Sequence, residues 1–151
     1  MFVQDQDLIS LHYDHAPDRD DGHATVSALM VVRSLGIQPH VLSGAYGIRN
    51  SHRYQPAAEQ VMRQTWGTAW VNAHANRQAA VSATASRWLA TLLNGGDIWV
   101  AEGGQSDVTA DVVRSIRNTN PGINTGNRIH VVQHSIWNEQ HTTPVLSLIH
   151  I

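Results

Sequence analysis

Short apolar runs alternate along the chain with longer segments in which apolar residues recur at helical spacing. The short runs have the length of buried strands and lie at 8–12, 40–44, 68–72, 98–101 and 128–133. The longer segments predict helices at 24–32, 55–64, 77–93 and 107–118. Strands and helices in this alternating order predict an α/β fold, with an open, mostly parallel, Rossmann-like sheet and helices on both faces.

Polar residues gather directly after several predicted strands, at 14–21, 46–50, 102–107 and 134–139. The carboxyl ends of parallel strands meet at one edge of a sheet, and ligands bind beyond that edge in open α/β folds. We therefore expect these polar clusters to converge on one site.

Composition narrows the class of protein. The chain has 151 residues, which is the size of one domain, and 42% of them are hydrophobic. The formal net charge is -2, so no basic excess is present to bind nucleic acid. Because cysteine is absent, a bound metal would need oxygen or imidazole ligands. Neither a signal peptide nor a membrane-spanning apolar run is evident, which predicts a cytoplasmic protein without a membrane partner.

Four carboxylates lie close together at the first strand-to-helix junction, on Asp14, Asp18, Asp20 and Asp21. Carboxylates at this spacing repel one another, and a hard cation such as Ca²⁺ or Mg²⁺ offsets that repulsion. The alternative is a solvated acidic loop in which one aspartate caps the helix. The position at a strand end favours a metal site.

The same stretch resembles the opening motif of the nucleoside hydrolase family, Asp-x-Asp-Pro-Gly-x-Asp-Asp. Asp14, Pro17, Asp20 and Asp21 fall in register with that motif. The resemblance implies that Asp14 is a metal ligand and the base that orients the attacking water. It further implies that Asp20 binds sugar hydroxyls and that Asp21 chelates Ca²⁺.

Two positions depart from the motif. Ala16 stands where the family has its second Asp, and Asp18 stands where it has Gly. These departures indicate a divergent member and leave the substrate open. The resemblance covers most of residues 8–135.

Three later residues complete the expected site. The loop after the second predicted strand resembles the family's Gly-Asn loop, which makes Asn50 a candidate substrate-binding residue. The loop after the fourth strand resembles one that supplies a backbone carbonyl to the metal, and Ser106 occupies that position. Trp137 follows the last predicted strand and is expected to line the pocket from the same edge of the sheet.

The far end of the chain suggests truncation. The family places a further metal-binding Asp and a pocket His later in its chain, and neither has a match here. Residues 146–151 match one reading frame of a transposase adapter used in DNA sequencing libraries. We therefore expect residues 1–145 to be the N-terminal part of a nucleoside hydrolase-like domain and residues 146–151 to be a non-native tail. A chain with part of its ligands missing is expected to bind metal loosely and to be inactive on nucleosides.

Other metals stay open at this point. His12, Asp14, His15 and His23 lie near one another in sequence, which leaves zinc as an alternative, although zinc sites usually pair their ligands at helical or hairpin spacing. Residues 15–20 also resemble the His-x-Pro-Asp-x-Asp opening of DHH-type phosphoesterases, which would use Mn²⁺. The later Asp-His-His motif of that family does not occur in the chain.

The leading interpretation is a metal-dependent hydrolase that cleaves the N-glycosidic bond of a nucleoside or related ribosyl compound, with Asp14 activating water. Its partner would be a small ribosyl substrate, and a homo-oligomer is left open. A non-catalytic protein of the same fold that binds a sugar or nucleoside is a third interpretation. Because an acidic loop does not identify the bond that is cleaved, the chemistry follows from the resemblance.

Overall fold

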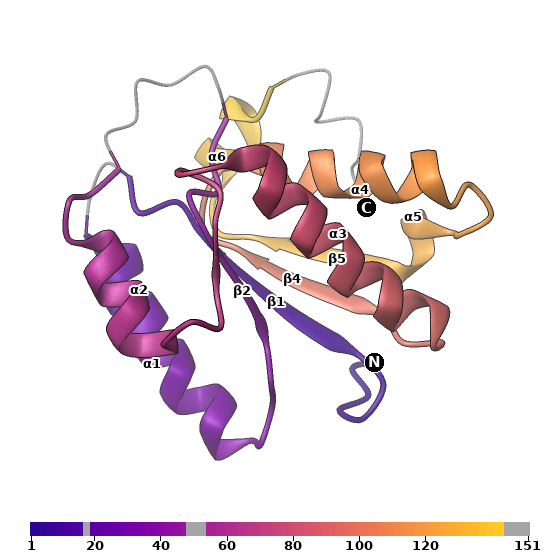
Figure 1. Ribbon diagram of the computed structural model, residues 1–151, viewed down its shortest axis with the longest axis horizontal. Coiled ribbons are helices and arrows are strands. Elements are labelled where there is room, and N and C mark those ends of the chain that lie inside the picture. Colours follow the sequence, from indigo (N-terminus) through magenta and orange to yellow (C-terminus); the bar gives the residue numbers. More distant parts are fainter. Residues whose placement is uncertain (17–18, 48–53, 144–151) are drawn as a thin grey trace.

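The computed structural model describes residues 1–16, 19–47 and 54–143, and within these residues five parallel strands form one open sheet (Figure 1). The strands are β1 (Leu8–Tyr13), β2 (His40–Ser43), β3 (Val71–Asn72), β4 (Ile98–Glu102) and β5 (Ile129–Gln133). Their order in the sheet is β3-β2-β1-β4-β5. The predicted Rossmann-like α/β fold is confirmed. The expected tail at 146–151 lies outside the described residues.

Helices cover the sheet on both faces, as predicted. The helices α1 (Asp20–Ser34) and α2 (Ala58–Trp66) pack together on one face (Figure 1). The helices α3 (Arg77–Leu93) and α4 (Asp107–Thr119) pack together on the other. Two shorter helices, α5 (Thr125–Arg128) and α6 (Ile136–His141), flank β5. Among the described residues, none of the helices is long and apolar enough to cross a membrane.

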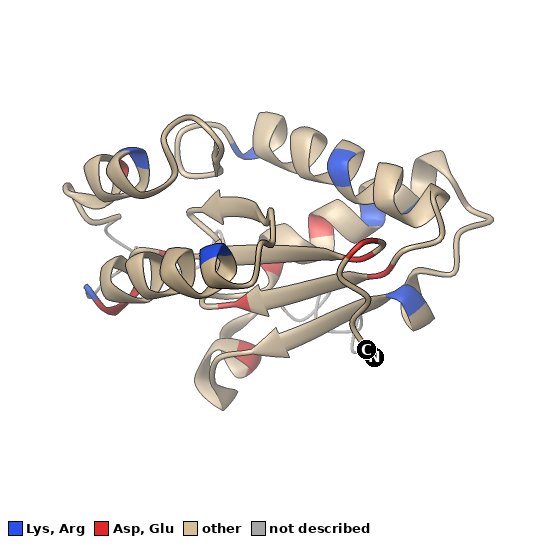
Figure 2. Ribbon diagram, turned by 90° about the horizontal axis from the view of Figure 1, so that it is seen from below, with Lys and Arg blue, Asp and Glu red and all other residues tan. Residues whose placement is uncertain are grey.

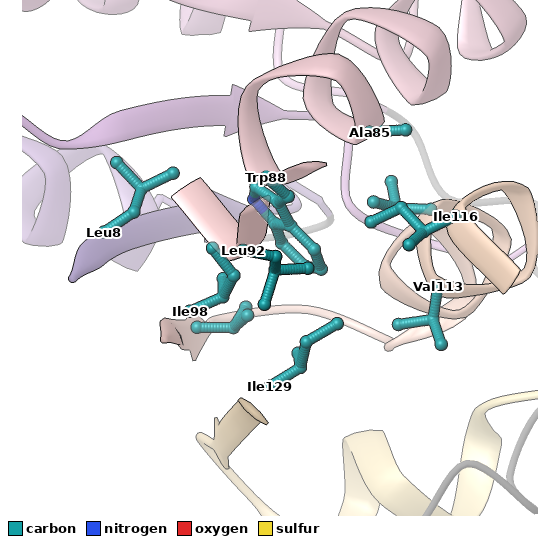
Figure 3. Packing of buried hydrophobic residues seen from close by; sticks show 10 residues of the cluster. Leu8, Ala85, Trp88, Leu92, Ile98, Val113, Ile116 and Ile129 are labelled. Atoms are coloured by element: carbon teal, nitrogen blue, oxygen red, sulfur yellow. The ribbon is translucent and has the colours of Figure 1, made fainter. Parts of the chain in front are cut away.

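The strand β1 is buried on both faces, which accounts for its nearly continuous apolar run. Leu11 and Tyr13 pack under the α1–α2 layer, whereas Leu8 packs under the α3–α4 layer. On that second face the indole ring of Trp88 is fully buried and packs against Ile98 of β4 (Figure 3). Charged residues are spread over separate helices and loops around these layers (Figure 2).

The strand order creates a crevice between β1 and β4. These strands pair in parallel from Leu8 opposite Ile98 to His12 opposite Glu102. The helix that follows β1 packs on one face of the sheet, and the helix that follows β4 packs on the other. The two chain segments therefore diverge at the carboxyl ends of β1 and β4. In open α/β sheets this topological switch point is where ligands bind.

Element boundaries differ from the predicted ones in ways that matter for the site. The helix α1 begins at Asp20 rather than at residue 24, so Asp20 and Asp21 lie in its first turn. The partial positive charge at a helix N-terminus stabilises carboxylates in that position. The strand β3 has only Val71 and Asn72. The helices α5 and α6 were not predicted, because elements of four and six residues are too short to show a helical repeat.

Candidate functional site

The candidate site lies at the crevice between β1 and β4. Asp14 directly follows β1, and Gly103 and Gly104 directly follow β4. The amide of Gly103 donates to the carbonyl of His12 at 2.8 Å, which continues the pairing with β1 beyond the end of β4. The predicted polar loops 14–21 and 102–107 therefore do meet at the edge of the sheet.

Two buried carboxylates stand at the centre of this crevice. Asp14 is 8% exposed and Asp21 is 6% exposed. Asp14 Oδ1 accepts from the amide of Ala16 at 2.9 Å, and Asp21 Oδ2 accepts from the amide of His15 at 2.9 Å. Main-chain donors thus hold both carboxylates in place.

The electrostatics of the pair favour a bound cation. The pKa of Asp14 is raised to about 8, chiefly by burial. The hydrogen bond from the Ala16 amide lowers this pKa, and the nearby Asp21 and Asp20 carboxylates raise it. The Asp21 carboxyl group is close enough to interact with Asp14 directly. Two carboxylates in such contact do not both ionise readily unless positive charge is supplied.

The glycines after β4 allow this close packing. A Cβ atom on Gly103 would lie 3.0 Å from Asp21 Oδ1. A Cβ atom on Gly104 would lie 2.6 Å from the Cβ of Asp14 and 2.1 Å from the carbonyl oxygen of Ala45. The backbone of the β4 loop therefore approaches the side chains of Asp14 and Asp21 closely, and at Gly104 only glycine fits. In the sequence, the only signal of this approach is the Gly-Gly pair that ends a strand.

A pocket of about 220 Å³ opens beside the carboxylates. Its described lining residues are Asp14, Ala16, Asp20, Gly103, His134, Ser135, Trp137 and Asn138. The structure therefore brings Asp14, Asp20 and Trp137 together, as the sequence predicted. The helix α6 supplies one wall, because Asn138 Nδ2 donates to the carbonyl of Gly103 at 3.2 Å. The indole of Trp137 stacks on His141 with ring centroids 3.9 Å apart and remains half exposed.

Three other predicted site residues are not placed at this pocket. Asp21 is not among its described lining residues and lines a neighbouring pocket instead. The carbonyl of Ser106, expected to bind metal, accepts from the amide of Ala110 at 2.8 Å at the start of α4, and the Ser106 hydroxyl donates to Gln133. Ser106 is not among the described residues that line the pocket. Asn50, like Pro17 and Asp18 of the motif, lies outside the described residues.

The metal ligands that the structure brings together are few. Across residues 1–16, 19–47 and 54–143, no group of three or more His, Asp and Glu side chains is arranged to hold a metal ion. His12, which was a candidate zinc ligand in the sequence, is fully buried. Its Nε2 lies 2.9 Å from Ser10 Oγ, and its Nδ1 lies 2.9 Å from Thr109 Oγ1. Asp14 and Asp21 therefore offer oxygen ligands suited to a hard cation, but only part of a coordination shell.

A buried polar network beneath the site was missed by sequence reasoning. Trp88 Nε1 donates to Ser10 Oγ at 3.1 Å, and Ser10 Oγ lies 2.9 Å from His12 Nε2. His12 Nδ1 lies 3.3 Å from Glu102 Oε2, which also accepts from the hydroxyl of Thr109. An indole N–H can only donate, so the hydroxyl proton of Ser10 is free to bond Nε2, and Nδ1 then carries the ring proton.

This network has the order of a Ser-His-acid triad, but its position excludes that role. The side chains of His12 and Glu102 are 0% exposed and Ser10 is 0% exposed, so no substrate reaches the hydroxyl. The arrangement instead ties β1, β4 and α4 together directly under the carboxylates. The available sequence signal was the alternation of Ser10 and His12 within an apolar strand, which predicts side chains on one face.

No protein-family model, curated protein or solved structure matches this chain. The site itself consists of buried carboxylates at the switch point of a parallel sheet, held by main-chain amides, beside a small pocket with an indole ring at its wall.

Proposed function

We propose that the chain carries the metal-binding half of a hydrolase that cleaves the N-glycosidic bond of a ribosyl compound. The observation that carries the proposal is the contact of two buried carboxylates, Asp14 and Asp21, at the switch point between β1 and β4. The resemblance of residues 14–21 to the nucleoside hydrolase motif supports the choice of reaction.

The donor set fits a hard divalent cation, with Ca²⁺ preferred and Mn²⁺ or Zn²⁺ as alternatives. Asp14 and Asp21 would hold it through carboxylate oxygens, and any carbonyl contribution from Ser106 remains a proposal. Such a cation supplies positive charge that offsets the carboxylate repulsion and lowers the pKa of water in the site.

The chain's own residues would share the remaining tasks. Asp14, in its ionised form, would accept a proton from the attacking water. Asp20 lines the pocket at the first turn of α1, where it would bind sugar hydroxyls. Trp137 lines the same pocket and would stack on the leaving base. The negative charge of Asp14, Asp20 and Asp21 would stabilise the positive charge that develops on the sugar ring.

Ca²⁺ affinity is expected to depend on Asp21 and on pH. Replacing Asp21 with alanine removes one of the two buried oxygen ligands and should weaken binding by about tenfold or more. Because a proton on Asp14 competes with the cation, affinity should rise as pH increases toward about 8, the pKa of that carboxyl, and level off above it. Titration calorimetry from pH 6 to pH 9 measures both effects.

The matched control is Asp5→Ala, which removes an exposed carboxylate that precedes β1. Unchanged Ca²⁺ affinity in Asp21→Ala, or equal losses in both variants, would show that the cation does not bind at the switch point.

A second experiment separates a hydrolase site from a sugar-binding site. A cationic iminoribitol mimics the positively charged sugar of the transition state, and a catalytic site binds such mimics about 100-fold or more tightly than the neutral sugar. We therefore expect iminoribitol to bind far more tightly than ribose, and Asp20→Asn to remove most of that preference. Equal affinity for the two compounds would favour the non-catalytic sugar-binding protein.

Ribose release from nucleosides, measured in the same samples, is expected to be absent, because the described residues supply only part of a metal shell.

A further inference from the structure

A second and larger pocket lies between α1 and α2, which run side by side on one face of the sheet (Figure 1). Its volume of about 670 Å³ is typical of small-molecule sites. Apolar side chains from both helices line it, among them Val26 and Leu29 of α1 and Val61 of α2. The proposed hydrolase makes no use of this pocket.

One polar side chain of this pocket is buried without a partner. His15 lines the pocket and is 2% exposed, and its Nε2 has no hydrogen-bond partner among the described residues. Buried polar atoms are nearly always paired in folded proteins, so this imidazole nitrogen requires a partner that the described residues do not supply.

The main chain fixes His15 in this position. Its φ of 53° lies in the left-handed region, which residues with a Cβ atom seldom adopt. Its amide donates to Asp21 Oδ2 at 2.9 Å, and its carbonyl accepts from the amide of Gln55 at 2.9 Å. A strained backbone that is held from both sides is typical of positions selected for function rather than for stability.

The charges around the pocket favour a neutral ligand. Arg19 lines the pocket, and no Asp or Glu is among its described lining residues. The carboxylates of Asp21 and Asp20 also act on the His15 ring, so charges of both signs lie near this end of the pocket and an uncharged ligand suits it. A hydroxyl group suits the unpaired Nε2 of His15, because it can donate to an imidazole nitrogen or accept from it.

We propose that the α1–α2 pocket binds an uncharged small molecule with an apolar body and one hydroxyl group, and that the hydroxyl group pairs with His15 Nε2. The apolar side chains would bury the body of the ligand, and His15 would select for the hydroxyl. Binding at this pocket is independent of the proposed hydrolase reaction.

The test uses 4-methylphenol as the probe, with toluene and 4-methylbenzoate as matched compounds that lack the hydroxyl or carry a charge. Binding is followed by the backbone amide NMR signals of the full chain. 4-Methylphenol is expected to shift the amides of α1 and α2 saturably and to bind about fivefold to tenfold more tightly than toluene. His15→Phe keeps an aromatic ring and should remove that difference. 4-Methylbenzoate should bind less tightly than 4-methylphenol.

A second variant tests binding at this pocket even if His15→Phe fails to fold. Val26 is 46% exposed on α1, so Val26→Trp fills the pocket from the surface and should abolish binding while the fold is retained. Equal affinity for toluene and 4-methylphenol would show an apolar cavity without hydroxyl recognition. Tighter binding of the benzoate, shifts confined to amides elsewhere, or full binding by Val26→Trp would each overturn the proposal.

Discussion

Replacing Gly104 with alanine is expected to destabilise the fold by about 3 kcal/mol or more, because the added methyl group has no space. The new Cβ would lie 2.1 Å from the carbonyl oxygen of Ala45 and 2.6 Å from the Cβ of Asp14. Both neighbours follow buried strands, and neither is the end of a flexible side chain. The backbone between β1, β2 and β4 must therefore move apart.

Urea unfolding followed by circular dichroism measures this loss. The matched control is Gly122→Ala, since no atom beyond its chain neighbours lies within 4 Å of a Cβ at that position. The control should change stability by less than about 1 kcal/mol. If Gly104→Ala were as stable as this control, the close approach of the β4 loop to Asp14 would be wrong.

Replacing Glu102 with alanine is expected to cost about 3–5 kcal/mol of stability, since it removes one partner from a buried polar network. Glu102 Oε2 accepts from Thr109 and lies 3.3 Å from His12 Nδ1, and both side chains of the His12–Glu102 pair are 0% exposed. Without the carboxylate, the polar atoms of His12 and Thr109 would lose this partner in a site that excludes water. The vacated volume adds a further cost.

The control for Glu102 is Glu59→Ala, which removes an exposed carboxylate paired with Arg63 at 3.6 Å on α2. Exposed pairs of this kind contribute about 0.5 kcal/mol or less. Thermal and urea unfolding of the two variants should therefore differ by several kcal/mol. A loss in Glu102→Ala no larger than that in Glu59→Ala would show that the network does not stabilise the junction of β1, β4 and α4.

The fold class and the position of the carboxylates were predictable because both depend on local patterns. Apolar runs of strand length and segments with apolar residues at helical spacing repeat along the chain. Each can be recognised in the sequence without knowing which other elements pack against it. The cluster at Asp14, Asp20 and Asp21 was evident because its residues are adjacent in sequence and follow an apolar run. The convergence of Trp137 on Asp14 also followed from a general property of parallel sheets, whose strands end at one edge.

The features that define the site in detail depend on contacts between distant segments, which no local pattern encodes. Strand order places β4 beside β1, and this pairing makes the crevice. The need for glycine at position 104 arises only when Ala45 and Asp14 meet it. Glu102 reads as a loop residue in the sequence, yet it is buried against His12, 90 positions away. Periodicity reports which face of an element is buried, whereas the partner on that face is chosen by the packing of the whole chain.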